Sequence, residues 1–186
     1  MKVPQKQIRC VILIDGSNFY FKLKDLKLHN LLEFGFSGFA KMLAGKDKIV
    51  SATYYVGKIR TDGTKKTQKL FDNQRKLLAC LRKYNLKYSL GYLMKSGGKY
   101  HEKGVDVAMA VDMLVAVYEN LCERIILVSS DTDLLPAIDK AKEKGKIIEY
   151  AGFSHKPSVA MVARCTRSRL LTKEDVELFM VTGGKP

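Results

Sequence analysis

The sequence predicts an α/β fold, one layered domain in which helices cover both faces of a parallel sheet. Short β-branched runs alternate along the chain with longer segments of helical periodicity, which is the pattern of such sheets. The strand-like run at residues 8–14 is almost continuously apolar, as expected of a strand covered on both faces. Of the 186 residues, 46% are hydrophobic, which is typical of a chain with a well-buried core.

Five segments are predicted to be the strands of this sheet. Each is short, largely apolar and rich in β-branched or aromatic residues. Because helical segments separate them, consecutive strands are expected to pair in parallel. The five segments are residues 8–14, 49–56, 86–93, 124–129 and 146–150.

The helical segments are predicted from their apolar spacing. Residues 64–84 carry one stripe of leucines, and residues 105–118 are apolar nearly all round, which indicates a buried helix. Further helical regions are expected at 18–43 and at 134–144. The sequence TKED at 172–175 resembles a capping box and opens a last helix near Glu174.

The charge balance favours a polyanionic partner. The chain has 33 basic and 19 acidic residues, a net charge of +14 and an isoelectric point near 9.6. Such an excess is typical of proteins that bind nucleic acid first, and anionic membrane surfaces second. No segment approaches the ~18 apolar residues of a membrane span, and nucleic acid rather than a membrane is the expected partner.

The cysteines indicate a reducing compartment. Their spacing fits neither a zinc site nor a disulfide framework, so all four are expected to be free thiols. The N-terminus lacks a signal-peptide apolar region, and a cytoplasmic location is expected. We expect one domain over residues 1–186, with a core at about 8–152 and a C-terminal helical segment at about 153–181.

Two predicted strands end in carboxylates. The first delivers Asp15 to its tip, and the fourth is followed by Asp131 and Asp133. The carboxyl ends of parallel strands meet at one edge, where α/β sheets bind ligands. Carboxylates that converge there repel one another and normally share a cation, and oxygen ligands favour Mg²⁺ or Mn²⁺.

A third acidic segment is KGVDVAMAVDML, which contains Asp106 and Asp112. Asp106 opens the predicted buried helix, and Asp112 lies about 9 Å further along its axis. Each aspartate also has a plainer interpretation. Asp15, Asp106 and the pair at 131 and 133 are candidates to cap helices, and Asp112 to bond a neighbouring serine or lysine. Two strand tips that both end in aspartate, within a basic protein, favour metal binding.

These motifs resemble the NYN domains, a branch of the PIN-like metal-dependent nucleases. The resemblance spans about residues 8–152 and rests on VILIDGSNFY, KGVDVAMAVDML and LVSSDTDLLPAI, in this order. It implies a three-layer Rossmann-like fold with about five parallel strands in the order 3-2-1-4-5. One departure is Ser130, where the family often has glycine before its final acidic pair.

The resemblance also implies an activity and a set of site residues. The activity is hydrolysis of phosphodiester bonds, usually of RNA, with one or two Mg²⁺ or Mn²⁺ ions in an acidic pocket. Asn18 would orient the pocket or the substrate phosphate, and Asp112 would be a ligand or support one. The implied metal ligands are Asp15, Asp106, Asp131 and Asp133.

Most of the positive charge lies between residues 58 and 103, which hold 13 basic and 3 acidic residues. Some of these basic side chains lie on the exposed face of the helix at 64–84, and others in a loop with tyrosines and two glycines. The basic side chains could follow a phosphate backbone, and the tyrosines could stack on unpaired bases. The alternative is a solvated helix face. Arg164, Arg167 and Arg169 form a second cluster, either across the groove or beside the last helix. The predicted nucleic-acid contacts are Lys65, Lys69, Arg75, Lys76, Lys95, Lys99, His101 and Lys103.

The function predicted from the sequence is therefore a metal-dependent nuclease acting on nucleic acid, RNA in preference to DNA. The main alternative is a nucleic-acid-binding or adaptor module of the same fold with little or no catalysis. A metal-free ribonuclease using two of His29, His101 and His155 is a lesser alternative. A metal-dependent adhesion domain is disfavoured, because its DxSxS metal motif needs a hydroxyl-bearing residue at the position where DGSNF has Phe19. A second copy of this chain is a further candidate partner.

Overall fold

The computed structural model describes residues 7–28, 30–96 and 99–180. Over these residues the chain forms a seven-stranded sheet in the order β4-β3-β2-β1-β5-β6-β7. All neighbouring strands are parallel except β3 and β4, which form an antiparallel hairpin. The five predicted strands and their 3-2-1-4-5 order are confirmed. The strands are β1 (Arg9–Asp15), β2 (Lys48–Gly57), β3 (Lys87–Ser96), β4 (Lys99–Lys103), β5 (Arg124–Val128), β6 (Ile147–Phe153) and β7 (Arg167–Leu171).

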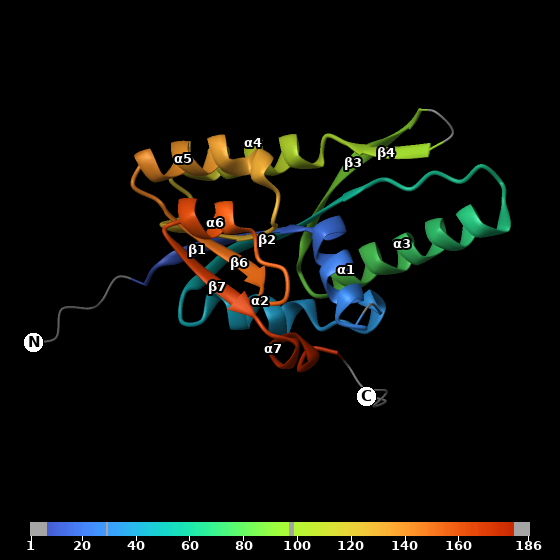
Figure 1. Cartoon of the computed structure of the whole chain (residues 1–186), viewed down its shortest axis with the longest axis horizontal. Coiled ribbons are helices and arrows are strands. Elements are labelled where there is room, and N and C mark those ends of the chain that lie inside the picture. The colour runs from blue at the N-terminus through green and yellow to red at the C-terminus, as the bar shows by residue number, and fades with distance from the viewer. Residues whose placement is uncertain (1–6, 29, 97–98, 181–186) are drawn as a thin grey trace, which may run out of the picture.

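Helices cover both faces of the sheet, which makes three layers (Figure 1). One face carries α1 (Gly16–Asp25), α2 (Phe36–Ala44), α3 (Lys65–Lys83) and α7 (Lys173–Glu177). The other carries α4 (Val105–Tyr118), α5 (Leu135–Glu143) and α6 (Val159–Arg164). Short 3-10 turns, η1 (Leu31–Glu33) and η2 (Thr132–Leu134), precede α2 and α5. Within the described ranges no helix has the length and apolarity needed to cross a bilayer.

The central strand β1 separates two hydrophobic cores. Its alternate side chains point to opposite faces, so Ile12 and Ile14 join the core under α1, α2 and α3. Val11 and Leu13 join the core under α4 and α5. By the same alternation Asp15 points to the α4 side, and this places the candidate carboxylate between the strand tips and α4.

Two of the predicted helical segments are wrong in part. The region 18–43 is two helices, because the chain turns at Lys27 (φ 63°) and forms η1 before Gly35. The segment after residue 152 is not only helical, since it contains β7 between α6 and α7. The capping box is confirmed at the start of α7, where Thr172 and Asp175 bond each other's backbone N–H.

The prediction that residues 105–118 form a helix buried on all sides is also wrong. Met109 and Met113 are fully buried against the sheet, but Val107 is 67% and Val111 52% exposed. The reason is architectural: the helices on this face form a single layer, and no described element packs over the outer side of α4.

Two arms project beyond the carboxyl ends of the strands (Figure 1). Gln74 of α3 is buried and bonds Gly57 O and Ile59 N at the end of β2, so the turns of α3 before it extend past the sheet. The pairing of β3 with β2 ends at Gly91, and the rest of β3 continues into the hairpin with β4. The arms therefore flank the edge at which Asp15 lies.

The packing of the four cysteines leads to a first prediction. Burial raises the pKa of the Cys10 and Cys165 thiols to about 11 and also raises that of Cys122, whereas Cys80 on α3 is half-buried. Because the thiolate is the reactive form, we expect only Cys80 to react rapidly with Ellman's reagent in the native protein. All four should react in denaturant. Rapid native reaction of two or more thiols would contradict this packing.

Candidate active site at the carboxyl edge of the sheet

Asp15 is the last residue of β1 and is held from two directions. Its Oδ1 accepts a hydrogen bond from Asn18 N (2.9 Å), which caps α1. Its Oδ2 accepts one from Ser129 Oγ (2.9 Å), just past the end of β5. The side chain is only 5% exposed, and burying a carboxylate is costly unless its charge is compensated. Its orientation is thus fixed at the junction of the two central strands.

Gly16 explains why β1 can turn directly into α1 at this point. A Cβ on Gly16 would lie 2.4 Å from the Tyr54 ring and 2.7 Å from Tyr55 O, distances that real Cβ atoms do not show. The Tyr54 hydroxyl also donates to Gly16 O (3.2 Å). Only glycine allows the turn to pack this closely on β2, and this contact sets the position of Asp15.

Ser129 joins the two acidic strand tips. While its hydroxyl donates to Asp15, its Oγ accepts from Asp131 N (3.1 Å). The Oδ1 of Asp131 accepts from Asp133 N (2.9 Å) and caps η2. Asp131 is half-buried and Asp133 exposed. The plainer interpretation is confirmed for Asp15, which caps α1, but Asp131 caps only the 3-10 turn η2, and α5 has no side-chain cap. Ser129 also ties the two aspartates together.

Asp112 reaches the same region through Tyr55. Tyr55 is the register partner of Asp15 on β2, and its hydroxyl donates to Asp112 Oδ2 (2.7 Å). Burial, and then the bond to Asp112, raises the pKa of Tyr55, so the phenol stays a neutral donor. The expected serine or lysine partner of Asp112 was wrong. The tyrosine lies 57 residues away in sequence and is found only from the strand register.

Asp106 lies in the first turn of α4 and is half-buried. It does not cap the helix, because Gly104, with φ 82°, holds the N-cap position. The start of α4 is pinned to β3, where a Cβ on Gly91 would meet Lys103 O and the Val105 side chain at 2.7 Å. Asp106 thus lies on the β3 side of the edge and Asp131 on the β5 side.

The carboxylates do not form a closed metal-binding cluster. Over residues 7–28, 30–96 and 99–180, no group of three or more His, Cys, Asp or Glu side chains has a geometry that could hold an ion. The donors are nevertheless all carboxylate oxygens, the chemistry that suits Mg²⁺ or Mn²⁺. Ser129 links Asp15 to Asp131. Asp112 bonds Tyr55, which is the neighbour of Asp15 on β2.

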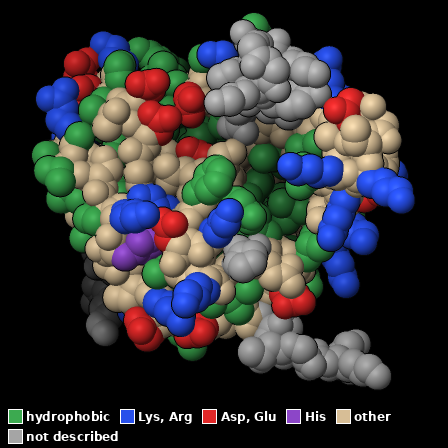
Figure 2. Space-filling model, turned by 45° about the vertical axis from the view of Figure 1, so that its right-hand side comes forward, with side chains coloured by type: hydrophobic (Ala, Val, Ile, Leu, Met, Phe, Trp, Pro, Cys, Tyr) green, Lys and Arg blue, Asp and Glu red, His purple; other side chains and the backbone are tan. Residues whose placement is uncertain are grey.

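The predicted basic residues of α3 are all exposed; Lys65 and Lys69 lie on its projecting part, and Arg75 and Lys76 follow Gln74 directly. Three of them border an open groove of about 490 Å³, and the Arg75 guanidinium lies 5.9 Å from the centre of the Phe71 ring. Figure 2 shows Lys and Arg side chains gathered along the right-hand side of one face beside a hollow, whereas basic and acidic side chains are mixed over the rest of that face. The groove is lined by Gly63, Lys65, Gln68, Lys69, Asp72, Asn73 and Lys76.

The other predicted residues are more scattered. Asn18 is half-buried in the first turn of α1, and Lys103 is exposed at the end of β4. The side chains of Lys95, Lys99 and His101 lie outside the described part, as does His29. His155 is in the loop after β6, near Asp25 rather than the strand-tip aspartates.

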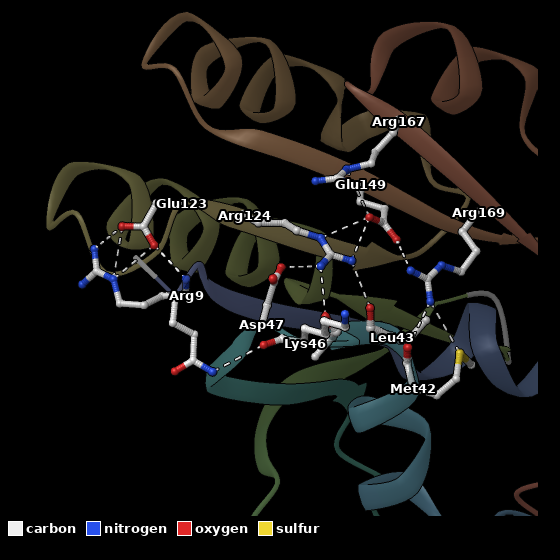
Figure 3. A network of polar contacts seen from close by, with 12 residues as sticks. Arg9, Met42, Leu43, Lys46, Asp47, Glu123, Arg124, Glu149, Arg167 and Arg169 are labelled. Carbon is white, nitrogen blue, oxygen red and sulfur yellow. Dashed lines mark hydrogen bonds and ion pairs between the residues drawn. The ribbon is translucent and has the colours of Figure 1, made fainter. Parts of the chain in front are cut away.

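None of the three arginines near the C-terminus is among the residues that line the groove, and two of them join a network of ion pairs (Figure 3). Arg167 and Arg169 of β7 pair with the buried Glu149, and Arg164 pairs with Asp139 of α5. Glu149 also pairs with Arg124, the first residue of β5, so this network lies toward the amino ends of the strands. The predicted groove role is unsupported, because the charges are used within the fold.

Comparison with known proteins agrees with this arrangement. The family model of the NYN domain matches residues 9–171. The chain belongs to the NYN domain family. This family is part of the PIN-like nuclease superfamily. None of the curated proteins matches the chain in sequence.

A solved structure shares the fold of this NYN domain. It is the crystal structure of a protein of unknown function from Vibrio parahaemolyticus, with a TM-score of 0.69 and 20% sequence identity. The match covers 92% of this chain and 96% of that protein. At this identity the likeness concerns the fold alone.

Proposed function

We propose that this NYN domain is a divalent-metal-dependent nuclease that hydrolyses phosphodiester bonds, with RNA as its preferred substrate and the cytoplasm as its location. The observation that carries the proposal is the link of Asp15 and Asp131 through Ser129 at the tips of the two central strands. A rigid sheet edge can hold carboxylates with the precision that metal chemistry needs.

The donor chemistry supports a divalent cation at this edge. Asp15 and Asp131 are the residues that would hold it, with Asp106, Asp112 and Asp133 as further carboxylates around the same edge. One or two Mg²⁺ or Mn²⁺ ions would supply an activated water and would stabilise charge on the phosphate oxygens.

The chain's own groups would orient the acidic residues. Ser129 and the backbone N–H of Asn18 fix the two oxygens of Asp15. The neutral Tyr55 hydroxyl holds Asp112 on the α4 side. Each contact keeps a carboxylate in one orientation before substrate arrives, which lowers the cost of reorganisation during the reaction. Asn18 is proposed to orient the substrate phosphate.

Cleavage of labelled nucleic acids tests this function. We expect end-labelled single-stranded RNA to be cut in Mn²⁺ or Mg²⁺ and to remain intact in EDTA, with structured RNA and single-stranded DNA cut more slowly. Salt-sensitive RNA binding without cutting in either metal would contradict the nuclease and favour the binding module. Faster cutting of DNA would contradict the substrate preference.

The α3 groove provides a separate prediction about substrate binding. Replacing Lys65, Lys69 and Lys76 with glutamine should weaken RNA binding and reduce the slope of log affinity against log salt by about 2, since each single-strand phosphate contact contributes ~0.7. Fluorescence anisotropy in EDTA measures both quantities. The control is Lys41, Lys48 and Lys173 changed together, because all three are exposed and lie outside the groove. Equal slopes in the two variants would contradict the groove assignment.

A further inference from the structure

A second basic cluster lies beside the carboxyl edge, on α1 and the loop after β6. Lys22 Nζ donates to Lys156 O (2.6 Å), and Lys156 Nζ donates to Asp25 Oδ2 (2.7 Å). His155 Nε2 lies 3.8 Å from the same carboxylate oxygen. Because α1 starts immediately after Asp15, this cluster is one end of a surface whose other end is the candidate active site.

Positive charge exceeds negative charge in this cluster. Lys156 and a titratable imidazole pair with the single carboxylate of Asp25, and Lys22 bonds the backbone carbonyl of Lys156 beside them. Burial, and then repulsion from Lys156, lowers the pKa of Lys22. Burial and the nearby Lys22 likewise lower the pKa of His155. An anion bound here would relieve this repulsion.

One face of α1 connects the cluster to the active site. Asn18, Lys22 and Asp25 are spaced at i, i+4 and i+7, which places them on one side of the helix. Phe19 and Leu23 lie about 100° further round the helix than Asn18 and Lys22, and both are fully buried in the core. The face that carries Asn18, Lys22 and Asp25 therefore runs from the turn next to Asp15 to the basic cluster. Asn18 and Asp25 are seven residues apart, about 10 Å along the helix axis.

An exposed aromatic ring lies on the same face. Phe21 is 60% exposed, three residues after Asn18 and four before Asp25. The Tyr20 ring contacts its edge at a centroid distance of 5.5 Å. A large apolar ring left in solvent beside lysines is the arrangement by which proteins stack unpaired bases and hold the adjacent phosphate.

We propose that the outward face of α1 binds the strand of a single-stranded nucleic acid next to the scissile bond, with a base stacked on Phe21 and a phosphate bound by Lys22 and Lys156. This inference rests on the proposed function, since it assigns a subsite to the same substrate. Lys156 follows β6, which is four strand spacings from the β3 strand that α3 packs on, about 19 Å at ~4.8 Å each, so this lysine and the α3 groove would contact different parts of one nucleic-acid strand.

Binding in EDTA tests the proposal without cleavage. Fluorescence anisotropy is measured with unstructured RNA of about 16 nucleotides, and with a duplex of the same sequence. Phe21→Leu should weaken single-strand binding about fivefold or more and leave the salt slope unchanged, because it removes stacking only. Duplex binding should be unaffected, since paired bases are not available.

The charged residues are expected to behave differently. Lys22→Gln with Lys156→Gln should weaken binding and reduce the salt slope by up to about 1.4. Asp25→Asn should tighten binding, because it removes the carboxylate that competes with phosphate, a gain that misfolding would not produce. The matched control is Lys41→Gln with Lys48→Gln, which removes equal charge from exposed sites near the amino end of β2.

The possible failures are distinguishable. Wild-type protein that binds no RNA would overturn the proposed function and this subsite with it. If the wild type binds RNA, but Phe21→Leu, the double variant of Lys22 and Lys156, and Asp25→Asn all bind it as the control variant does, the α1 subsite alone is overturned. Equal losses of single-strand and duplex binding in Phe21→Leu would overturn the stacking assignment.

Discussion

Asp15→Asn is expected to reduce RNA cleavage by more than about 10²-fold while the fold survives. Groups that only hold a metal ligand in place typically contribute 10- to 100-fold, and a direct ligand should contribute more. Asparagine can still cap α1, because its side-chain oxygen accepts from Asn18 N as the carboxylate does. Cleavage rates in saturating Mn²⁺ and thermal unfolding, measured on the same preparations, check both statements.

The control for this variant is Glu119→Gln, which removes an exposed carboxylate at the far end of α4. If Asp15→Asn cleaves RNA at the wild-type rate, the candidate active site is wrong. The cleavage rate of Ser129→Ala should lie between those of Asp15→Asn and Glu119→Gln, with a 10- to 100-fold loss and a need for more Mn²⁺. Ser129→Thr should restore part of the loss, because it keeps the hydroxyl that orients Asp15.

The second large effect concerns stability. Glu149 is 2% exposed and pairs with Arg124 (2.8 Å), Arg167 (3.4 Å) and Arg169 (3.2 Å). Two of these arginines also donate to carbonyls at the end of α2, Arg124 to Leu43 O and Ala44 O, and Arg169 to Met42 O (Figure 3). Glu149→Gln should therefore lower the free energy of unfolding by about 3 kcal/mol, because three arginines lose this buried carboxylate although Arg124 keeps its ion pair with Asp47.

Urea unfolding measures this loss. The comparison is Glu123→Gln, which breaks the half-exposed pair with Arg9 and should cost much less, since solvent screens that pair. A single Glu149→Gln as stable as Glu123→Gln would contradict the role of the network.

The fold and the position of Asp15 could be predicted because local patterns determine them. A continuous apolar run that stops at a polar residue marks a strand tip, and alternating strands and helices place such tips at one edge. The contacts of Asp15 could not be read in this way. Ser129 is also an ordinary turn residue, and Tyr55 meets Asp112 only because of the register between β1 and β2.

The strand β7 was missed for a related reason. Arg167 and Arg169 alternate along it on the side where they pair with Glu149, but arginine normally indicates a solvated surface. Their buried partner, Glu149, lies on another strand, and the pairing is evident only in the folded protein. The same distant pairing explains why the sequence left their place open between the groove and the last helix.

Direct Mn²⁺ binding tests the central claim that the carboxylates at the strand tips hold the catalytic ion. Electron paramagnetic resonance of free Mn²⁺, titrated with protein, gives the number of bound ions and their affinity. The account predicts one or two ions on the wild-type protein and on Glu119→Gln, with the tightest site lost in Asp15→Asn. Identical Mn²⁺ binding by wild type and Asp15→Asn, or no binding by either, would contradict it.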